Sequence, residues 1–361
     1  MISPALAHLP TLLAPERLPQ HAPLAVQTRD GLVESVHYGS VIATAADGRT
    51  LLAAGEPLAP FYPRSALKPL QAVAMVRAGL DLPDELLALA AASHSGAATH
   101  RDGARRILDL HGLTPGDLEN SADLPYGARE REDWLGGGGE ATQLAQNCSG
   151  KHAAMAATCV INGWPVRGYL DPEHPLQELV ARTVADLTGE EPKRTSTDGC
   201  GTPLFALTLR GMARAFGRLA AAAEAGGSAE AEAGGSAEAG VARAMRRHPQ
   251  MVAGEGRDVT ALMRLVPGLV AKDGFEGVQL VGLPDGRAVA VKISDGGDRA
   301  RMPVTVRVLA ALDVDTSPLA RIAAAPVLGG GRPVGLLQAT DFLAASESPA
   351  YPGASAASEA L

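Results

Sequence analysis

The segment VQLVGLPDGRAVAVKI, residues 278–293, carries the clearest fold signal of the chain. Two apolar runs flank the turn sequence at 284–286 (Pro-Asp-Gly), which is the pattern of a β-hairpin. A second hairpin is predicted near the other end, where VESVHYGSVIA (33–43) and TLLAA (50–54) flank a second turn, Ala-Asp-Gly. Hairpins at the two ends predict a single antiparallel sheet that both build together.

The sequence between the hairpins has mainly the apolar spacing of helices. The predicted helices span residues 66–78, 85–92, 101–110, 150–161, 175–187 and 204–222, while 301–312 fits a strand or a helix. Strands at both ends with helices between them predict an α+β fold, in which helices flank an antiparallel sheet, and not a parallel βαβ series. No Gly-x-Gly-x-x-Gly follows a predicted strand, and the glycine run 136–139 is interpreted as a loop.

The chain is predicted to form one catalytic α+β domain, residues 26–345, after an N-terminal extension, 1–25, and before a disordered tail, 346–361. The octamer AEAGGSAE occurs twice in succession, at 223–230 and 231–238. Its Gly, Ser, Glu and Ala content is typical of a solvated segment, so 223–240 is predicted as a flexible insertion.

Composition excludes several classes of protein. The net charge of −8 without a basic run argues against nucleic acid and anionic membranes as partners. No stretch approaches ~18 uninterrupted apolar residues, so no membrane span is expected, and the first residues lack the pattern of a signal peptide. Three cysteines in 361 residues do not make a disulfide framework, which favours a cytoplasmic location.

Basic residues are overwhelmingly arginine, with 27 Arg and five Lys. A lysine in such a chain is a candidate for a position that Arg cannot fill, because an ammonium can give up its proton and a guanidinium effectively cannot. Three of the five lysines, Lys68, Lys151 and Lys272, fall inside motif-like segments.

The first of these segments is Pro-Arg-Ser-Ala-Leu-Lys-Pro at 63–69. If Ser65 opens a helix, Lys68 lies on the same face and within reach of the hydroxyl. A desolvated lysine can activate a serine as a nucleophile, and Ser-x-x-Lys is the nucleophile motif of penicillin-recognising enzymes. The motif alone is weak, since two fixed positions in four recur by chance.

The other segments each leave a structural alternative open. Ser93, in Ala-Ser-His-Ser-Gly at 92–96, is either a second hydroxyl of a site or part of a helix-capping turn. Cys148, Lys151 and Cys200 either converge on a metal or are buried groups without function, because Cys-x-x-Lys is a poor zinc pattern. Lys272, in Ala-Lys-Asp-Gly, faintly resembles the Lys-Thr-Gly element that accompanies Ser-x-x-Lys, with Asp in place of Thr.

Taken together and in order, five segments resemble the asparaginase II family of the rhizobial type. They are Pro-Arg-Ser-x-x-Lys-Pro (63–69), Ala-Ser-His-Ser (92–95), Asn-Cys-Ser-Gly-Lys-His (147–152), Thr-Asp-Gly-Cys (197–200) and His-Pro-x-Met-Val-Ala-Gly-Glu-Gly-Arg (248–257). The resemblance runs from about residue 26 to 307, and five ordered motifs are far more specific than any one of them. Val259 departs from the rhizobial relative, which has a cysteine there.

The resemblance implies a fold akin to serine β-lactamases and glutaminases, a homodimer, and hydrolysis of L-asparagine to L-aspartate and ammonia. It implies Ser65 as nucleophile with Lys68 as its base, and Ser93 partnered with Lys272. It implies zinc near the substrate. The zinc ligands would be Cys148, Lys151 and Cys200, and the substrate-binding residues would be Asp198, for the α-amino group, with Arg64 and His152 beside the pocket.

Two other classes of function stay open. One is a different Ser-Lys amidohydrolase, such as a glutaminase or a penicillin-interacting enzyme. The other is a zinc-binding regulatory protein that uses Cys148 and Cys200 without catalysis, in which case the serine and lysine motifs would be incidental.

Overall fold

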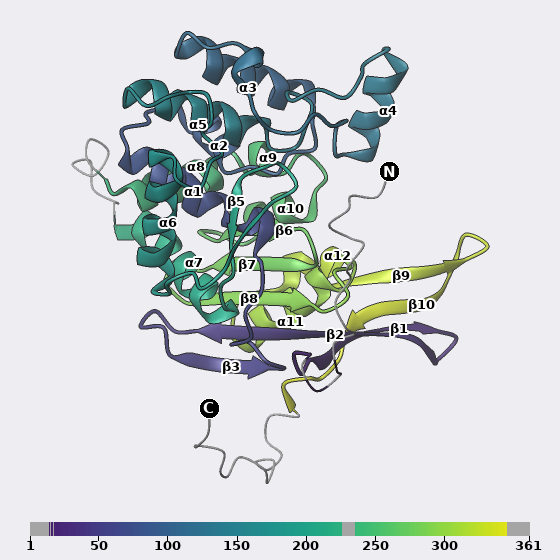
Figure 1. Cartoon of the computed structure of the whole chain (residues 1–361). Coiled ribbons are helices and arrows are strands. Elements are labelled where there is room, and N and C mark those ends of the chain that lie inside the picture. Colours follow the sequence, from purple (N-terminus) through teal and green to yellow (C-terminus); the bar gives the residue numbers. More distant parts are fainter. Residues whose placement is uncertain (1–13, 15, 17, 226–234, 345–361) are drawn as a thin grey trace.

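The computed structural model describes residues 14, 16, 18–225 and 235–344, and it places a large antiparallel sheet against a cluster of helices (Figure 1). The sheet has eight strands in the order β6-β7-β8-β2-β1-β10-β9, with β3 paired to β2. These strands are β1 (Ala22–Arg29), β2 (Leu32–Thr44), β3 (Thr50–Ala54), β6 (Val270–Gly274), β7 (Val278–Gly282), β8 (Ala288–Ile293), β9 (Ala324–Gly329) and β10 (Arg332–Ala339). The predicted α+β class is confirmed.

The two predicted hairpins meet at the centre of this sheet. Strand β2 pairs with β8 in a continuous register that runs from Gly39 opposite Ile293 to Thr44 opposite Ala288. On its other side β2 pairs with β1, and β1 pairs in turn with β10. The two ends of the chain therefore build a single sheet together, as the hairpin patterns predict.

Helices cover the sheet on both faces. Helix α7 packs on β7, β8 and β2, whereas α11 packs on β7, β8 and β10, and every residue of β7 is buried. Helices α1 to α6 and α8 to α10 lie on the side of the sheet that α7 covers, whereas α12 packs against α11 and β9 (Figure 1). The α-helices are α1 (Lys68–Arg77), α2 (Asp84–Ala90), α3 (Ala98–Leu110), α4 (Ala128–Gly136), α5 (Ser149–Ile161), α6 (Pro175–Thr188), α7 (Leu209–Ala225), α8 (Ala237–Arg247), α9 (Pro249–Val252), α10 (Asp258–Leu265), α11 (Arg301–Ala311) and α12 (Ala320–Ala323).

Short elements complete the fold. The 3-10 helices are η3 (Arg64–Leu67), η4 (Pro115–Asp117) and η6 (Ser317–Leu319), and β4 (Thr195–Thr197) pairs with β5 (Pro203–Phe205) in a small separate sheet. None of the helices in the described ranges is long and apolar enough to cross a membrane.

Several predicted boundaries are wrong. The predicted extension 1–25 includes the start of β1 at Ala22. The predicted helix 204–222 begins only at Leu209, because Pro203–Phe205 pairs as a strand with β4. The segment 301–312, for which the sequence left both a strand and a helix open, forms helix α11.

The predicted insertion 223–240 is helical at both ends. Helix α7 continues to Ala225, and α8 begins after Ser236, whose hydroxyl accepts a hydrogen bond from the Ala239 N–H at 3.3 Å and so caps the helix. Residues 226–234, and the predicted tail 346–361, lie outside the described residues.

Candidate active site and metal-binding residues

Ser65 lies where the 3-10 helix η3 meets the end of strand β6. Arg64, the residue before it, has a left-handed backbone with φ of 52°, which is uncommon for a residue other than glycine. Strand β6 can approach this turn only because Gly274 has no side chain: a Cβ there would lie 2.4 Å from the Pro63 carbonyl oxygen. The close approach of β6 therefore places Ser65 between the sheet and the helices.

Lys68 begins helix α1 and is 1 % exposed. Its Nζ donates hydrogen bonds to the Ala92 carbonyl at 2.7 Å, to Ser93 Oγ at 2.9 Å and to Cys148 Sγ at 3.1 Å. The predicted contact between Lys68 and Ser65 is replaced by this set, and no hydrogen bond joins the two among the described residues. The Ala92 and Cys148 acceptors hold Nζ on the Ser93 side of the turn.

Ser93 lies in an extended segment that crosses two other loops. Its N–H bonds the Val252 carbonyl, and the next two N–H groups bond Asn147 and Ala253. Helix α2 has already ended at Ala90, so the segment that carries Ser93 is a junction between distant loops and not simply a capping turn.

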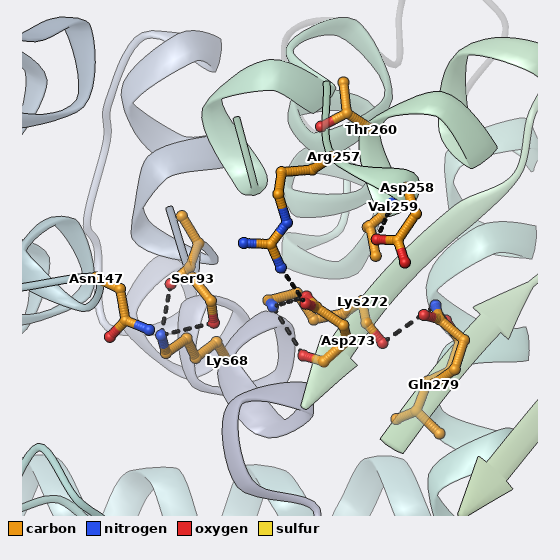
Figure 2. A network of polar contacts seen from close by, with 12 residues as sticks. Lys68, Ser93, Asn147, Arg257, Asp258, Val259, Thr260, Lys272, Asp273 and Gln279 are labelled. Atoms are coloured by element: carbon orange, nitrogen blue, oxygen red, sulfur yellow. Dashed lines mark hydrogen bonds and ion pairs between the residues drawn. The ribbon is translucent and has the colours of Figure 1, made fainter. Parts of the chain in front are cut away.

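Lys272 lies on β6 and is fully buried. Its Nζ donates to Asp273 Oδ1 at 2.6 Å and to the Asp273 carbonyl at 2.8 Å. Ser93, the predicted partner of Lys272, is hydrogen-bonded to Lys68 instead (Figure 2). Burial lowers the pKa of Lys272 to about 8, against the opposing effect of Asp273 and with further lowering by Lys68 and Arg257.

The three predicted metal ligands lie close together and are all buried, each at most 4 % exposed. Lys151 Nζ donates to Cys200 Sγ at 3.1 Å and to Thr202 Oγ1 at 2.9 Å. Cys148 and Cys200 both line one cavity. No group of three His, Cys, Asp or Glu side chains that could hold a metal occurs in the described part of the chain, so any zinc here depends on the lysine as third donor.

Electrostatics in this cluster favour one thiolate. A hydrogen bond from Cys148 lowers the pKa of Cys200 well below its usual value, against burial and with the help of Lys151 and His152. The same contact and burial raise the pKa of Cys148. Against the effect of burial, Cys200 and Cys148 raise the pKa of Lys151, so its Nζ is an ammonium that donates to Cys200. The two sulfurs and this nitrogen would fit zinc only once the lysine has given up its proton to the incoming metal.

Asp198 and Arg64 form an ion pair at the wall of this cavity, with Arg64 Nε donating to Asp198 Oδ1 at 2.7 Å. The Gly199 N–H donates to the same carboxylate oxygen at 2.9 Å. Both side chains line the cavity. A carboxylate and a guanidinium side by side are complementary to the ammonium and carboxylate of a free amino acid.

His152 is fully buried and belongs to a deeper layer. Its Nδ1 lies 2.9 Å from the Tyr169 hydroxyl, and burial followed by Lys151 lowers its pKa to about 4. His152 is absent from the lining of both cavities that contain Ser65. The structure therefore places it behind the cysteine and lysine cluster and away from the predicted substrate-binding position.

Two adjoining cavities meet at Ser65. The larger, about 160 Å³, contains Asp198 and the two cysteines, and the smaller, about 10 Å³, contains Ser93 and Asp273. Only the larger of the two has room for a small polar metabolite, because about 10–15 Å³ of such space holds no more than a single water. Residues that line both cavities are Ser65, Tyr126, Asn147 and Phe275.

Sequence reasoning missed Asp273, Arg257, Tyr126 and Asn147 at this site. Arg257 donates to Asp273 Oδ2 at 3.0 Å and lies over the Tyr126 ring, 4.9 Å from its centroid. Arg257 and Asn147 belong to two of the five family-like segments, and Asp273 stands where the Lys-Thr-Gly element has Thr.

Comparison with known proteins gives a family and distant structural neighbours. The family model described as L-asparaginase II matches residues 25–339. No curated protein matches the chain. Among solved structures, the chain is similar to a putative β-lactamase from Bacteroides dorei (15 % identity, 75 % of this chain and 93 % of that one, TM-score 0.40) and to a β-lactamase from Mycobacterium bovis (15 % identity, 76 % and 94 %, TM-score 0.34). It is also similar to the protein Mglu (16 % identity, 76 % and 67 %, TM-score 0.33).

Proposed function

The chain belongs to the L-asparaginase II family, and we propose that it hydrolyses the side-chain amide of L-asparagine through an ester formed on Ser65. The observation that carries the proposal is a buried lysine, Lys68, hydrogen-bonded to Ser93 Oγ at the cavity that Ser65 also lines. A desolvated lysine next to hydroxyl groups is the arrangement that serine activation needs.

In the first half-reaction Ser65 Oγ attacks the amide carbon. Its proton passes through the Ser93 hydroxyl, which lies between cavity and lysine, to Lys68. Lys68 accepts it once its amine is neutral and the hydrogen bond between the two has reversed, so that Ser93 Oγ donates to Nζ. The C–N bond then breaks, and the ammonium of Lys272 gives the leaving nitrogen a proton. Ammonia departs, the aspartyl group stays on Ser65, Lys68 is charged and Lys272 is neutral.

In the second half-reaction water attacks the ester. Neutral Lys272 takes a proton from the water, and Lys68 returns its proton to Ser65 as the ester bond breaks. Aspartate leaves and both lysines regain their starting states. A pKa of about 8 for Lys272 suits a group that both gives and takes a proton near neutral pH.

Substrate recognition is assigned to the Asp198 and Arg64 pair, which supports binding of the α-ammonium and α-carboxylate. Zinc held by Cys148, Lys151 and Cys200 would supply a positive charge that orients the substrate at the cavity wall. The nucleophile is already provided by Ser65, so no step of this reaction requires a metal-bound water.

Ammonia release from a panel of amides tests the proposal. Turnover of asparagine well above glutamine supports it, whereas preference for glutamine or a β-lactam would assign the same machinery to another substrate. Zinc binding without turnover of any amide would replace it by a regulatory role.

We further propose a homodimer and a cytoplasmic location. Three free cysteines among the described residues support a reducing compartment. Exposed apolar side chains at the β1–β2 and β9–β10 end of the sheet, Leu32, Val33, Tyr38 and Leu328, support a protein contact there. Light scattering of the purified chain measures the oligomeric state.

A further inference from the structure

Lys272 belongs to a chain of charges, with Asp273 and Arg257, beside the smaller cavity, which Asp273 lines (Figure 2). Asp273 accepts from Lys272 through Oδ1 at 2.6 Å and from Arg257 through Oδ2 at 3.0 Å. Each carboxylate oxygen thus has its own cationic partner. Adjacent residues of a strand normally point to opposite faces, so the contact between Lys272 and Asp273 at the end of β6 is a local exception.

The positions of the two cations differ in one important respect. Lys272 is completely buried, whereas Arg257 comes from the residue before helix α10 and its other face lies over Tyr126, which lines the cavity. Arg257 can therefore be removed without removing the lysine or its hydrogen bonds to Asp273.

Few charged groups face Lys272. They are Asp273 beside it, Arg257 ahead of α10 and Lys68 on α1. Asp273 in turn is faced by Lys272, Arg301 on α11 and Arg257, which together lower its pKa although burial would raise it. Arg301 is committed elsewhere, since its NH2 donates to Asp258 Oδ2 at 2.6 Å.

We propose that Asp273 and Arg257 are positioning residues that act on Lys272 in opposite directions: Asp273 stabilises its ammonium form, and Arg257 weakens that effect by sharing the carboxylate. This inference rests on the proposed function only in assigning the consequence to amide hydrolysis. The balance keeps Lys272 able to exchange a proton near neutral pH although it is buried.

Opposite effects separate this role from a merely structural one. Asp273→Asn removes the nearest negative charge, so the pKa of Lys272 falls by about one unit or more. Arg257→Gln removes a positive charge and leaves Asp273 wholly to Lys272, so the pKa of Lys272 rises. If the two substitutions only loosened the structure, the pKa of Lys272 would shift in the same direction in both variants or in neither.

The experiment uses the small number of lysines in the chain. Protein labelled with ¹³C at lysine Cε, purified without chelator, gives one signal for each of five lysines, and the signal of Lys272 is the one that Lys272→Arg removes. We expect its midpoint near pH 8 in the unmodified chain, lower in Asp273→Asn and higher in Arg257→Gln. Arg264→Gln, which removes an exposed Arg of α10 paired with Glu255, is the matched control for a lost guanidinium. Asp285→Asn is the control for a lost carboxylate.

Steady-state hydrolysis of asparagine against pH supplies the second readout. The high-pH limb of kcat should move down in Asp273→Asn and up in Arg257→Gln, while Asp273→Glu should restore a profile close to the original. If Asp273→Asn does not fold, the test rests on Arg257→Gln alone: an upward shift of the Lys272 midpoint supports the inference, and no shift or a downward shift contradicts it.

Shifts of the two variants in the same direction, or shifts no larger than in the controls, overturn the inference. The titration needs no substrate. A chain that fails to hydrolyse asparagine therefore contradicts the proposed function and leaves the inference about Lys272 intact. An active enzyme in which neither variant shifts the titration of Lys272 supports the proposed function and contradicts the inference.

Discussion

Replacing Lys68 by arginine tests the base on which the proposed reaction depends. The Nζ of Lys68 makes three hydrogen bonds in a site that is 1 % exposed. Arginine keeps the charge and the donors but cannot take up a proton. Loss of a general base costs about 10²- to 10⁴-fold in rate, or about 2.7–5.4 kcal/mol at 1.36 kcal/mol per tenfold. We expect kcat to fall in that range with KM little changed, because Asp198 and Arg64 are untouched.

The fold must be measured alongside the rate. Extra atoms in a packed site cost about 1–3 kcal/mol, so Lys68→Arg is compared with Lys68→Met, which removes Nζ without adding bulk. Lys193→Arg, an exposed position, is the matched control. Thermal unfolding followed by circular dichroism shows whether each variant is folded at the assay temperature.

The assay is ammonia release at saturating asparagine, and at limiting asparagine for kcat/KM. Ser65→Ala should lose activity at least as completely, because it removes the nucleophile itself. A folded Lys68→Arg enzyme that retains more than about a tenth of kcat, a loss below 1.4 kcal/mol, refutes the assignment of Lys68 as the base.

Three further perturbations test other parts of the site. Asp198→Asn should raise KM for asparagine about 10- to 100-fold with a smaller effect on kcat, since a charge-assisted bond contributes roughly 1.5–3 kcal/mol; equal losses in kcat would contradict a binding role. Elemental analysis should find about one zinc per chain, and its removal by chelation should raise KM more than it lowers kcat, an expectation that a loss of kcat at constant KM would reverse. Burial lowers the pKa values of His94 and His100, so the unfolded chain binds protons that the folded one does not. The free energy of unfolding should therefore decrease below about pH 6.5, by up to about 1.4 kcal/mol per pH unit for each histidine, and His100→Gln should flatten the slope measured by denaturant titration.

The sheet could be predicted only where the pairing is local. The hairpins of β2–β3 and β7–β8 have turn residues and apolar runs that act within about twenty positions. Strands β9 and β10 escaped prediction because Pro326 and Pro333 interrupt them and their half-exposed residues form no clear alternation. Their place in the sheet is set by pairing with β1, which lies some three hundred residues away.

The candidate site shows the same division. Motif order groups Ser65, Lys68, Ser93 and Lys272, and these four do lie around the two adjoining cavities or directly beside them. It did not give the partners, because the direction in which a long side chain points depends on acceptors from remote segments. Lys68 Nζ donates to the carbonyl of Ala92, which follows 24 residues later, with helix α2 between the two in the sequence. The spacing of residues within a motif does not predict such a contact.

The pairing of β2 with β8 has a consequence for synthesis of the chain on the ribosome. Thr44 lies opposite Ala288, so one edge of β2 stays open until about 240 further residues have emerged. At roughly 5–20 residues per second that wait is roughly 12–50 s. During this interval β2 and β3 offer an unpaired strand edge to any neighbouring chain, which is the geometry of aggregation. Expression in cells should therefore depend on holdase chaperones and on growth temperature more than the stability of the finished fold would suggest.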